Sequence, residues 1–155
     1  MLDADALALL AERTARLDEP AGPRILTPHP GEFRRFVEVA ELPRQRYEQL
    51  AVHMAETRNL VIVLKGYKTM ITDGRQTVHN QTGNPGMATG GSGDVLTGVI
   101  TALICQGLSP FEAAQLGAHV HGLAGDLAAA EIGQTSLIAS DLVRYLPQAF
   151  INLEA

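Results

Sequence analysis

The stretch from Asn80 to Gly98, NQTGNPGMATGGSGDVLTG, limits the possible folds more than any other part of the chain. It places five glycines between Gly83 and Gly93, where the missing Cβ permits positive φ and lets backbone N–H groups approach a ligand closely. Beyond it, apolar residues recur at helical spacing, namely Val95, Leu96, Val99, Ile100, Leu103 and Ile104. We therefore predict a glycine-rich turn that opens a helix near Ser92 or Gly93.

The N-terminus of that helix is a candidate anion site. Its first N–H groups lack partners inside the helix and carry the positive end of the helix dipole, which suits a phosphate or the transition state of phosphoryl transfer. The residues that would form this anion hole are Gly91, Ser92 and Gly93. Asp94 stands in the first turn, where it either balances the dipole or faces the bound group. Taken alone, the stretch is explained more simply as a tight turn with a charge-balanced helix start, so the choice depends on the rest of the chain.

Length and composition set broad limits on the fold and on the partners. With 155 residues, 46% of them hydrophobic, the chain suits a single domain over residues 1–155. The net charge of −5 and the pI near 5.5 argue against nonspecific binding to nucleic acid. No apolar run reaches membrane-spanning length, and no basic stretch precedes an apolar core at the N-terminus, so we expect a cytoplasmic protein without a membrane partner. Cys105, the only cysteine, follows an apolar helical pattern and is predicted to be a small core residue.

Apolar periodicity and turn residues predict an α/β fold. Leu60 to Leu64 is an unbroken apolar run of strand length, which is typical of a parallel strand buried on both faces. Asp73-Gly74 favours a hairpin at the sheet margin. The other predicted elements, in chain order, are a helix capped by Asp3 or Asp5 and running to about Leu17, a strand end at Arg24–Thr27, a helix over GEFRRFV, a helix from Pro43 to about Asn59, a helix from Pro110 to about Glu131 opened by a capping box at Ser109 and Glu112, and a short last helix capped by Ser140 before Pro147.

Two short segments follow predicted strands, at the edge of the sheet where ligands bind in open α/β folds. Lys65 and the residues up to Thr69 follow the buried strand. His29-Pro30-Gly31-Glu32 follows the earlier strand, where a histidine and a carboxylate could contact a ligand and a hydrated Mg²⁺. A proline-rich turn with Glu32 in the first turn of the next helix explains the same residues equally well.

Three residues of the predicted helix from Pro110 to Glu131 invite a metal-site interpretation, namely His119, His121 and Asp126. This is the weaker interpretation, because His119 and His121 are two positions apart and face different sides of the helix. Residues three or four apart share a helix face, and metal ligands on one helix need such spacing.

Five motifs resemble, in order along the chain, those of the ADP- or ATP-dependent NAD(P)H-hydrate dehydratases, a carbohydrate-kinase-domain family of the ribokinase-like superfamily. The resemblance covers nearly the whole chain, and the GMATGGSGDVL block is highly specific. It implies a three-layer α/β sandwich with a mostly parallel central sheet. It also implies a repair reaction, in which the hydroxyl of hydrated NADH or NADPH is phosphorylated and phosphate is then eliminated. The motifs are TPHPGE from Thr27, LKGYKT from Leu64, GNPGMATGGSGDVLTG from Gly83, HGLAGDLAA from His121 and SLIASDL from Ser136.

The resemblance further implies roles for single residues. His29 would contact the hydrated dinucleotide, and Asp94 would bind it too and act as the base at the reacting hydroxyl. Glu32 falls where the wider superfamily has an acid near Mg²⁺. The cofactors would be ADP or ATP and Mg²⁺, and the hydrate would be the substrate. The adenine-nucleotide site would be lined by Lys65, Gly66, Tyr67, Lys68, Thr69 and Gly93.

One departure from the family leaves alternatives open. The family's domain is about twice this length, and the chain begins inside the family's VLDADAL segment, so we expect a partial domain that lacks its N-terminal half. Uncovered sheet edges and apolar faces, such as that of Val95 to Ile104, would then favour a homo-oligomer or a partner chain that supplies this half. The alternatives to a dehydratase are a small-molecule kinase on the same fold and an inactive nucleotide-binding fragment. His29 argues against the kinase, because related kinases usually have Asn at the matching position.

Overall fold

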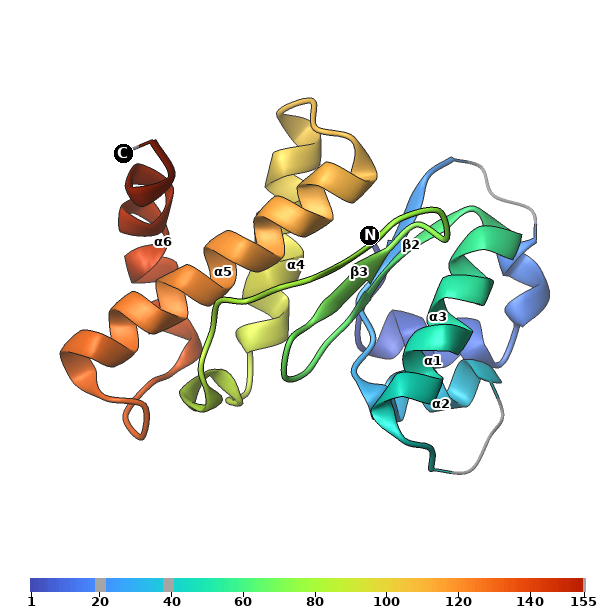
Figure 1. The fold of residues 1–155 in the computed structure, drawn as a ribbon, viewed down its shortest axis with the longest axis horizontal. Helices are drawn as coiled ribbons and strands as arrows, with labels where there is room; N and C mark the ends of the chain where they lie inside the picture. The colour runs from blue at the N-terminus through green and yellow to red at the C-terminus, as the bar shows by residue number, and fades with distance from the viewer. Residues whose placement is uncertain (19–21, 38–40, 155) are drawn as a thin grey trace.

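The structure, a computed structural model, describes residues 1–18, 22–37 and 41–154. Its elements, in chain order, are helix α1 Asp5–Ala11, 3-10 helix η1 Thr14–Leu17, strand β1 Arg24–Leu26, α2 Pro30–Val37, α3 Arg44–Arg58, β2 Leu60–Leu64, β3 Met70–Thr72, β4 Thr77–His79, 3-10 helix η2 Pro85–Met87, α4 Ser92–Cys105, α5 Pro110–Ile132 and α6 Ala139–Glu154. The sheet lies between α1, α2 and α3 on one face and α4 and α5 on the other (Figure 1). Among the described residues, no helix combines the length and apolar character needed to cross a membrane.

The four strands follow one another in the order β1-β2-β3-β4. β1 and β2 are parallel, with Ile25 opposite Val61, and Leu2 adds a parallel bridge to Leu26. β3 runs antiparallel to both β2 and β4. At the turn between β3 and β4, Gly74 has a φ of +87°, a conformation that favours glycine. The predicted hairpin at the sheet margin is therefore confirmed, and the parallel part of the sheet consists of Leu2, β1 and β2.

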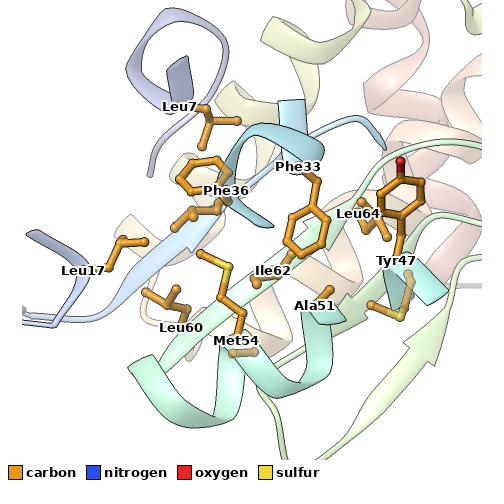
Figure 2. Packing of buried hydrophobic residues seen from close by; sticks show 13 residues of the cluster. Leu7, Leu17, Phe33, Phe36, Tyr47, Ala51, Met54, Leu60, Ile62 and Leu64 are labelled. Carbon is orange, nitrogen blue, oxygen red and sulfur yellow. The ribbon is translucent and has the colours of Figure 1, made fainter. Parts of the chain in front are cut away.

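The side chains of β2 are buried along its whole length and alternate between the two faces of the sheet. Leu60, Ile62 and Leu64 belong to the cluster that α1, α2 and α3 cover, which Figure 2 shows from close by. Val61 and Val63 belong to the cluster on the opposite face, beneath α4 and α5. The prediction of a strand buried on both faces is confirmed.

The apolar face of α4 packs into the second cluster, where Leu96, Val99, Ile100 and Leu103 are buried. The expectation that this face lacks a cover is wrong, because the sheet and α5 enclose it. Gly117 makes the close approach of α5 possible, since a Cβ at this position would lie 2.6 Å from Cγ1 of Ile100. The start of α5 also matches its prediction, as Ser109 and Glu112 form a reciprocal capping box.

The last helix differs from its prediction at both ends. α6 begins at Ala139, before Ser140, and Oδ2 of Asp141 accepts a hydrogen bond from the backbone N–H of Ile138 at 3.0 Å. The helix continues through Pro147 because that ring lies on the exposed face, while Ala149 on another face is buried against α5. Asp141 therefore does the capping that was expected of Ser140.

Three further expectations near the ends of helices are wrong. The predicted first helix ends at Ala11, and the residues from Thr14 to Leu17 form a separate 3-10 turn. The N-cap residue of α1 is Ala4, so neither Asp3 nor Asp5 caps this helix, and no side chain does so. Cys105 is exposed, because it lies two positions beyond the buried Leu103 and so on a different face of α4.

Candidate active site

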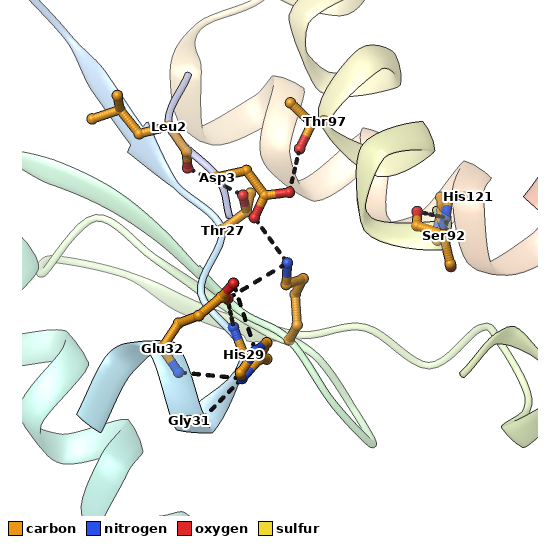
Figure 3. A network of polar contacts seen from close by, with 10 residues as sticks. Leu2, Asp3, Thr27, His29, Gly31, Glu32, Ser92, Thr97 and His121 are labelled. Carbon is orange, nitrogen blue, oxygen red and sulfur yellow. Dashed lines mark hydrogen bonds and ion pairs between the residues drawn. The ribbon is translucent and has the colours of Figure 1, made fainter. Parts of the chain in front are cut away.

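Lys65 stands where β2 ends, and two carboxylates converge on it. Its backbone N–H donates to the carbonyl of Pro28 at 2.8 Å, which joins the chain that leaves β1 to the chain that leaves β2. Its Nζ lies 2.9 Å from Oδ1 of Asp3 and 3.8 Å from Oε2 of Glu32. The surrounding polar network is drawn in Figure 3. The carboxyl ends of the two parallel strands thus carry one ammonium group between two carboxylates, as expected for the ligand edge of an α/β sheet.

Asp3 connects this cluster to α4. Its Oδ2 accepts a hydrogen bond from Oγ1 of Thr97 at 3.1 Å (Figure 3). Burial alone would raise the pKa of Asp3, but hydrogen bonds from Lys65, Thr27 and Thr97 and the charge of Lys65 outweigh it, so this pKa is lowered from 3.8. Gly93 borders the same pair, since a Cβ there would lie 3.2 Å from Nζ of Lys65 and 3.6 Å from Oδ2 of Asp3. The N-terminus of α4 therefore lies directly against the Lys65 cluster.

His29 and Glu32 form a capping box at the start of α2, with an imidazole in place of the usual hydroxyl. Nδ1 of His29 accepts hydrogen bonds from the backbone N–H groups of Gly31 at 3.0 Å and Glu32 at 3.2 Å. Oε2 of Glu32 accepts from the backbone N–H of His29 at 2.8 Å. Because Nδ1 is an acceptor, the ring hydrogen is on Nε2, and 56% of the side chain is exposed. The turn role is thus present. The Nε2–H group lies 3.6 Å from Oε1 of Glu32, on a side chain that is exposed enough for a ligand to reach it.

The proposed anion hole has the backbone that its glycines predict. Gly91 is the N-cap residue of α4 and has a φ of +86°, in the left-handed region. Within the described residues, the N–H groups of Gly91 and Gly93 donate no hydrogen bond, whereas that of Ser92 makes a 3.3 Å bond to the carbonyl of Thr89. Asp94 is exposed, and its side chain makes no hydrogen bond or ion pair with the described part of the chain. Its carboxylate is therefore free to face an incoming group.

The segment from Lys65 to Thr69 is held at its base and exposed at its tip. Arg44 of α3 donates to the carbonyl of Leu64 at 3.0 Å and to that of Lys65 at 2.9 Å. Tyr67 is 89% exposed, and Nζ of Lys68 lies 5.6 Å from the centre of its ring. The structure thus brings Lys65 together with Gly93, Glu32 and His29. No described hydrogen bond or ion pair links residues 66–69 to Gly93 or Asp94.

The three residues of the metal-site interpretation have other partners. Nε2 of His121 lies 3.0 Å from the carbonyl oxygen of Ser92, and burial lowers the pKa of His121 to about 4. Asp126 accepts hydrogen bonds from Gly83 and Asn84. His119 contributes its backbone carbonyl, which accepts a bond from Oγ1 of Thr82 at 2.8 Å. Each residue therefore contacts the glycine-rich stretch.

Sequence reasoning missed four residues of this site. Asp3 was interpreted as a helix cap, although its partner is 62 positions away. Thr97 lies one helical turn beyond Gly93, and that spacing could have placed it on the same helix face. His121 was considered only as a metal ligand. Arg44 gave no signal, because an arginine in the first turn of a surface helix is ordinary.

The three-layer α/β fold, with an ion cluster beside a glycine-rich helix start, is a ribokinase-like architecture. A solved ribokinase-like superfamily protein from Enterococcus faecalis superposes with a TM-score of 0.79 at 28% identity, over 97% of this chain and 51% of that one. The sequence model of the NAD(P)H-hydrate dehydratase family matches residues 1–148. The chain belongs to this family.

Two further relatives show how much of a longer protein this chain matches. The structure of the ADP/ATP-dependent NAD(P)H-hydrate dehydratase from Bacillus subtilis, co-crystallised with ATP and Mg²⁺, superposes with a TM-score of 0.85 at 37% identity. That match covers 97% of this chain and 53% of the Bacillus chain. The bifunctional NAD(P)H-hydrate repair enzyme Nnr of Moorella thermoacetica is 49% identical over an alignment of 158 positions that covers 99% of this chain and 29% of that enzyme. The chain thus spans less than a third of the curated repair enzyme and about half of the solved dehydratase.

Proposed function

We propose that this chain carries the phosphoryl-transfer half of an NAD(P)H-hydrate dehydratase site, which restores NADH or NADPH from its hydrate with ADP or ATP. The observation that carries the proposal is the contact of the Lys65–Asp3 ion pair with Gly93, directly before Asp94. This arrangement places an ammonium group, free backbone N–H groups and a free carboxylate at one helix start. Family membership supports the choice of a hydrate over other alcohols.

Each residue has a role that its geometry permits. The N–H groups of Gly91 and Gly93 would stabilise the charge that develops on the transferred phosphoryl group, with Ser92 between them. Lys65 and the segment from Gly66 to Thr69, namely Gly66, Tyr67, Lys68 and Thr69, would hold the nucleotide. The Nε2–H group of His29 would donate a hydrogen bond to the hydrated dinucleotide.

The reaction needs one well-placed base. Asp94 would accept the proton of the hydrate hydroxyl while that oxygen forms a bond to the terminal phosphorus of the nucleotide. The bond from that phosphorus to the bridging oxygen breaks, and the shortened nucleotide leaves. The phosphate ester then eliminates: the C–O bond to phosphate breaks, and the departing phosphate takes the proton from the neighbouring ring carbon, which restores the double bond. No group is oxidised or reduced.

Mg²⁺ fits the residues at this edge as an ion shared with the nucleotide. Asp3 and Glu32 both face Nζ of Lys65, so two carboxylates lie at this edge, and an ion bound here would share them with Lys65. Within the described residues, no group of three or more His, Cys, Asp or Glu side chains could hold a metal. Mg²⁺ commonly uses one or two carboxylates and takes its other ligands from phosphates and water. Glu32, with Asp3 beside it, would hold the ion, which would neutralise phosphate charge.

The test is to incubate the chain with hydrated NADH, Mg²⁺ and either ADP or ATP, and to follow recovery of NADH absorbance and release of phosphate together. A full-length repair enzyme serves as the positive control. The proposal predicts one phosphate for each NADH restored. Nucleotide consumption with a sugar or vitamin-precursor alcohol but not with the hydrate would support the kinase alternative instead. Nucleotide binding without any turnover would support the inactive fragment.

We also propose that the chain self-associates through α6. Val143, Pro147 and Ile151 recur every four positions along this helix and are all exposed, with Val143 at 54% and Ile151 at 57%. Residues at this spacing share one helix face, and an exposed apolar stripe favours association. Sedimentation at micromolar concentration tests this: Val143→Lys should shift the protein toward the monomer. A wild-type chain that sediments as a compact monomer would contradict it.

A further inference from the structure

Helix α5 runs along the glycine-rich stretch and holds it at two points. At the first point, the carboxylate of Asp126 accepts hydrogen bonds from the backbone N–H of Gly83 at 2.8 Å and from Nδ2 of Asn84 at 2.9 Å. Oδ1 of Asn84 in turn accepts from the N–H of Gly86 at 3.0 Å and caps the 3-10 helix η2. A single carboxylate thereby orders the beginning of the stretch.

His121 holds the end of the same stretch. Its Nε2 lies 3.0 Å from the carbonyl oxygen of Ser92, and the two side chains lie together in Figure 3. A carbonyl oxygen can only accept, so Nε2 carries the hydrogen in this bond. Both residues are 8% exposed, and water therefore does not readily replace the bond. Ser92 is the first residue of α4 and stands between the two glycines of the anion hole.

Two glycines of α5 allow the stretch to lie directly on the helix. A Cβ at Gly122 would come within 2.7 Å of the backbone carbonyl of Thr82. A Cβ at Gly125 would collide with the side chain of Met87, 2.7 Å from its Cγ. In an α-helix, both glycines cost stability relative to alanine. The close contact explains why the HGLAGD motif contains them.

The spacing of the two holding points shapes the stretch. His121 and Asp126 are five residues apart, which is about 7.5 Å along a helix axis. The ten residues from Gly83 to Ser92 could extend over roughly 30 Å if they were free. Because both ends of the stretch bind to neighbouring turns of α5, residues 83–92 must form an arch. This arch ends at the residues of the anion hole, Gly91, Ser92 and Gly93.

We propose that His121 and Asp126 are positioning residues, which fix the anion hole by holding the two ends of this arch on α5. The inference rests on the proposed phosphoryl-transfer function for its effect on rate, but the positioning itself does not depend on turnover. Both side chains contact the arch itself, at Gly83, Asn84 and Ser92, and neither is assigned a direct role in the reaction. Loss of either should therefore lower kcat more than it raises KM for the nucleotide or the hydrate.

The closing experiment compares three substitutions in the full chain. His121→Leu removes the donor to Ser92 at similar volume, and His121→Gln keeps a side-chain N–H close to the position of Nε2. His119→Gln is the matched control, because that side chain makes no hydrogen bond within the described residues. We expect amide hydrogen exchange over residues 84–95 to be about ten-fold faster in His121→Leu, near normal in His121→Gln and unchanged in His119→Gln.

Turnover provides the second readout. In an active chain, His121→Leu and Asp126→Asn should each lower kcat about ten-fold with KM changed less than three-fold, and His121→Gln should restore most of the rate. Unchanged exchange over residues 84–95 in both His121→Leu and Asp126→Asn would overturn the positioning proposal. A wild-type chain without turnover would contradict the proposed function alone, because the exchange measurement still decides whether these residues hold the arch. A His121→Leu chain that fails to fold leaves the decision to Asp126→Asn and His121→Gln.

Discussion

Nζ of Lys65 lies 2.9 Å from Oδ1 of Asp3, although the two residues are 62 positions apart in the chain. The side chains are 20% and 10% exposed, so solvent screens this ion pair only partly. Thr97 donates to the second oxygen of the same carboxylate. Together with Thr97, the pair joins the segment before α1, the end of β2 and the first turns of α4, which are the three segments that border the proposed phosphoryl-transfer site.

Asp3→Asn should lower stability through loss of this pair. The substitution keeps an acceptor for Thr97 but leaves the partly buried ammonium of Lys65 without its nearest carboxylate, at a cost of about 2 kcal/mol. Urea unfolding at pH 7 measures the difference. Asp5→Asn makes the same chemical change at an exposed position in the first turn of α1 and should change stability by less than about 0.5 kcal/mol.

The stability difference between wild type and Asp3→Asn should depend on pH in a definite direction. The pKa of Asp3 is lowered in the folded chain from 3.8, so the stabilisation is fully present above pH 3.8. It is lost only as pH falls through the lower folded pKa. The gap between wild type and Asp3→Asn should therefore persist from pH 7 to pH 5, and a gap that closes already at pH 6 would show that another group is responsible.

His121 should cause a separate loss of stability on acidification, at higher pH than the loss that involves Asp3. Its pKa is about 4 in the folded chain and 6.5 when exposed, so between these values the unfolded chain binds a proton that the folded chain does not. Stability should thus decrease as pH falls from 6.5 to 4, by about 3 kcal/mol in total from this group. Unfolding curves of His121→Gln should lack this part of the slope. Parallel pH profiles of the two proteins would contradict the assignment.

Gly93→Ala tests the contact between α4 and the Lys65 cluster. The added methyl group would stand 3.2 Å from Nζ of Lys65, where the flexible side chain can move aside but the nucleotide site changes shape. We expect nucleotide affinity, measured by titration calorimetry, to fall about ten-fold, which is about 1.4 kcal/mol. The control is Gly98→Ala in the same helix, where nothing lies within 4 Å of the new Cβ. Gly98→Ala should bind nucleotide normally and be more stable by up to about 1 kcal/mol.

If wild type and Gly93→Ala bind nucleotide with equal affinity, the nucleotide does not bind beside Gly93. A lower affinity in Gly98→Ala as well would mean that changes anywhere in α4 disturb the site, and Gly93 would then have no special position.

The parts of the fold that local chemistry determines could be predicted from the sequence. The apolar run of β2, the turn at Gly74 and the capping box of Ser109 and Glu112 each depend on residues close together in the chain. Cys105 could also have been placed correctly. It lies two positions after Leu103, so the helical period that identified the buried face already assigns it to another one.

Other features depend on partners that the local pattern does not reveal. Asp3 resembles a helix cap until Lys65, from a different element, is placed beside it. Pro147 signals the end of a helix, yet it sits on the exposed side of α6, where the carbonyl of Val143 can bond to water instead. The role of His121 likewise became visible only when α5 was packed on the start of α4.

The most direct test of the account is phosphate release by Asp94→Asn, measured beside nucleotide binding in the same preparation. Asp94 is exposed, and within the described residues it has no hydrogen-bond partner, so its substitution should leave the fold and the nucleotide site intact. A general base contributes about 10² to 10⁴-fold to the rate, and we predict that release of phosphate from hydrated NADH and ATP falls by at least about 100-fold while nucleotide affinity stays within about three-fold. Near-normal phosphate release in Asp94→Asn would contradict the central claim that this carboxylate takes the proton of the hydrate hydroxyl.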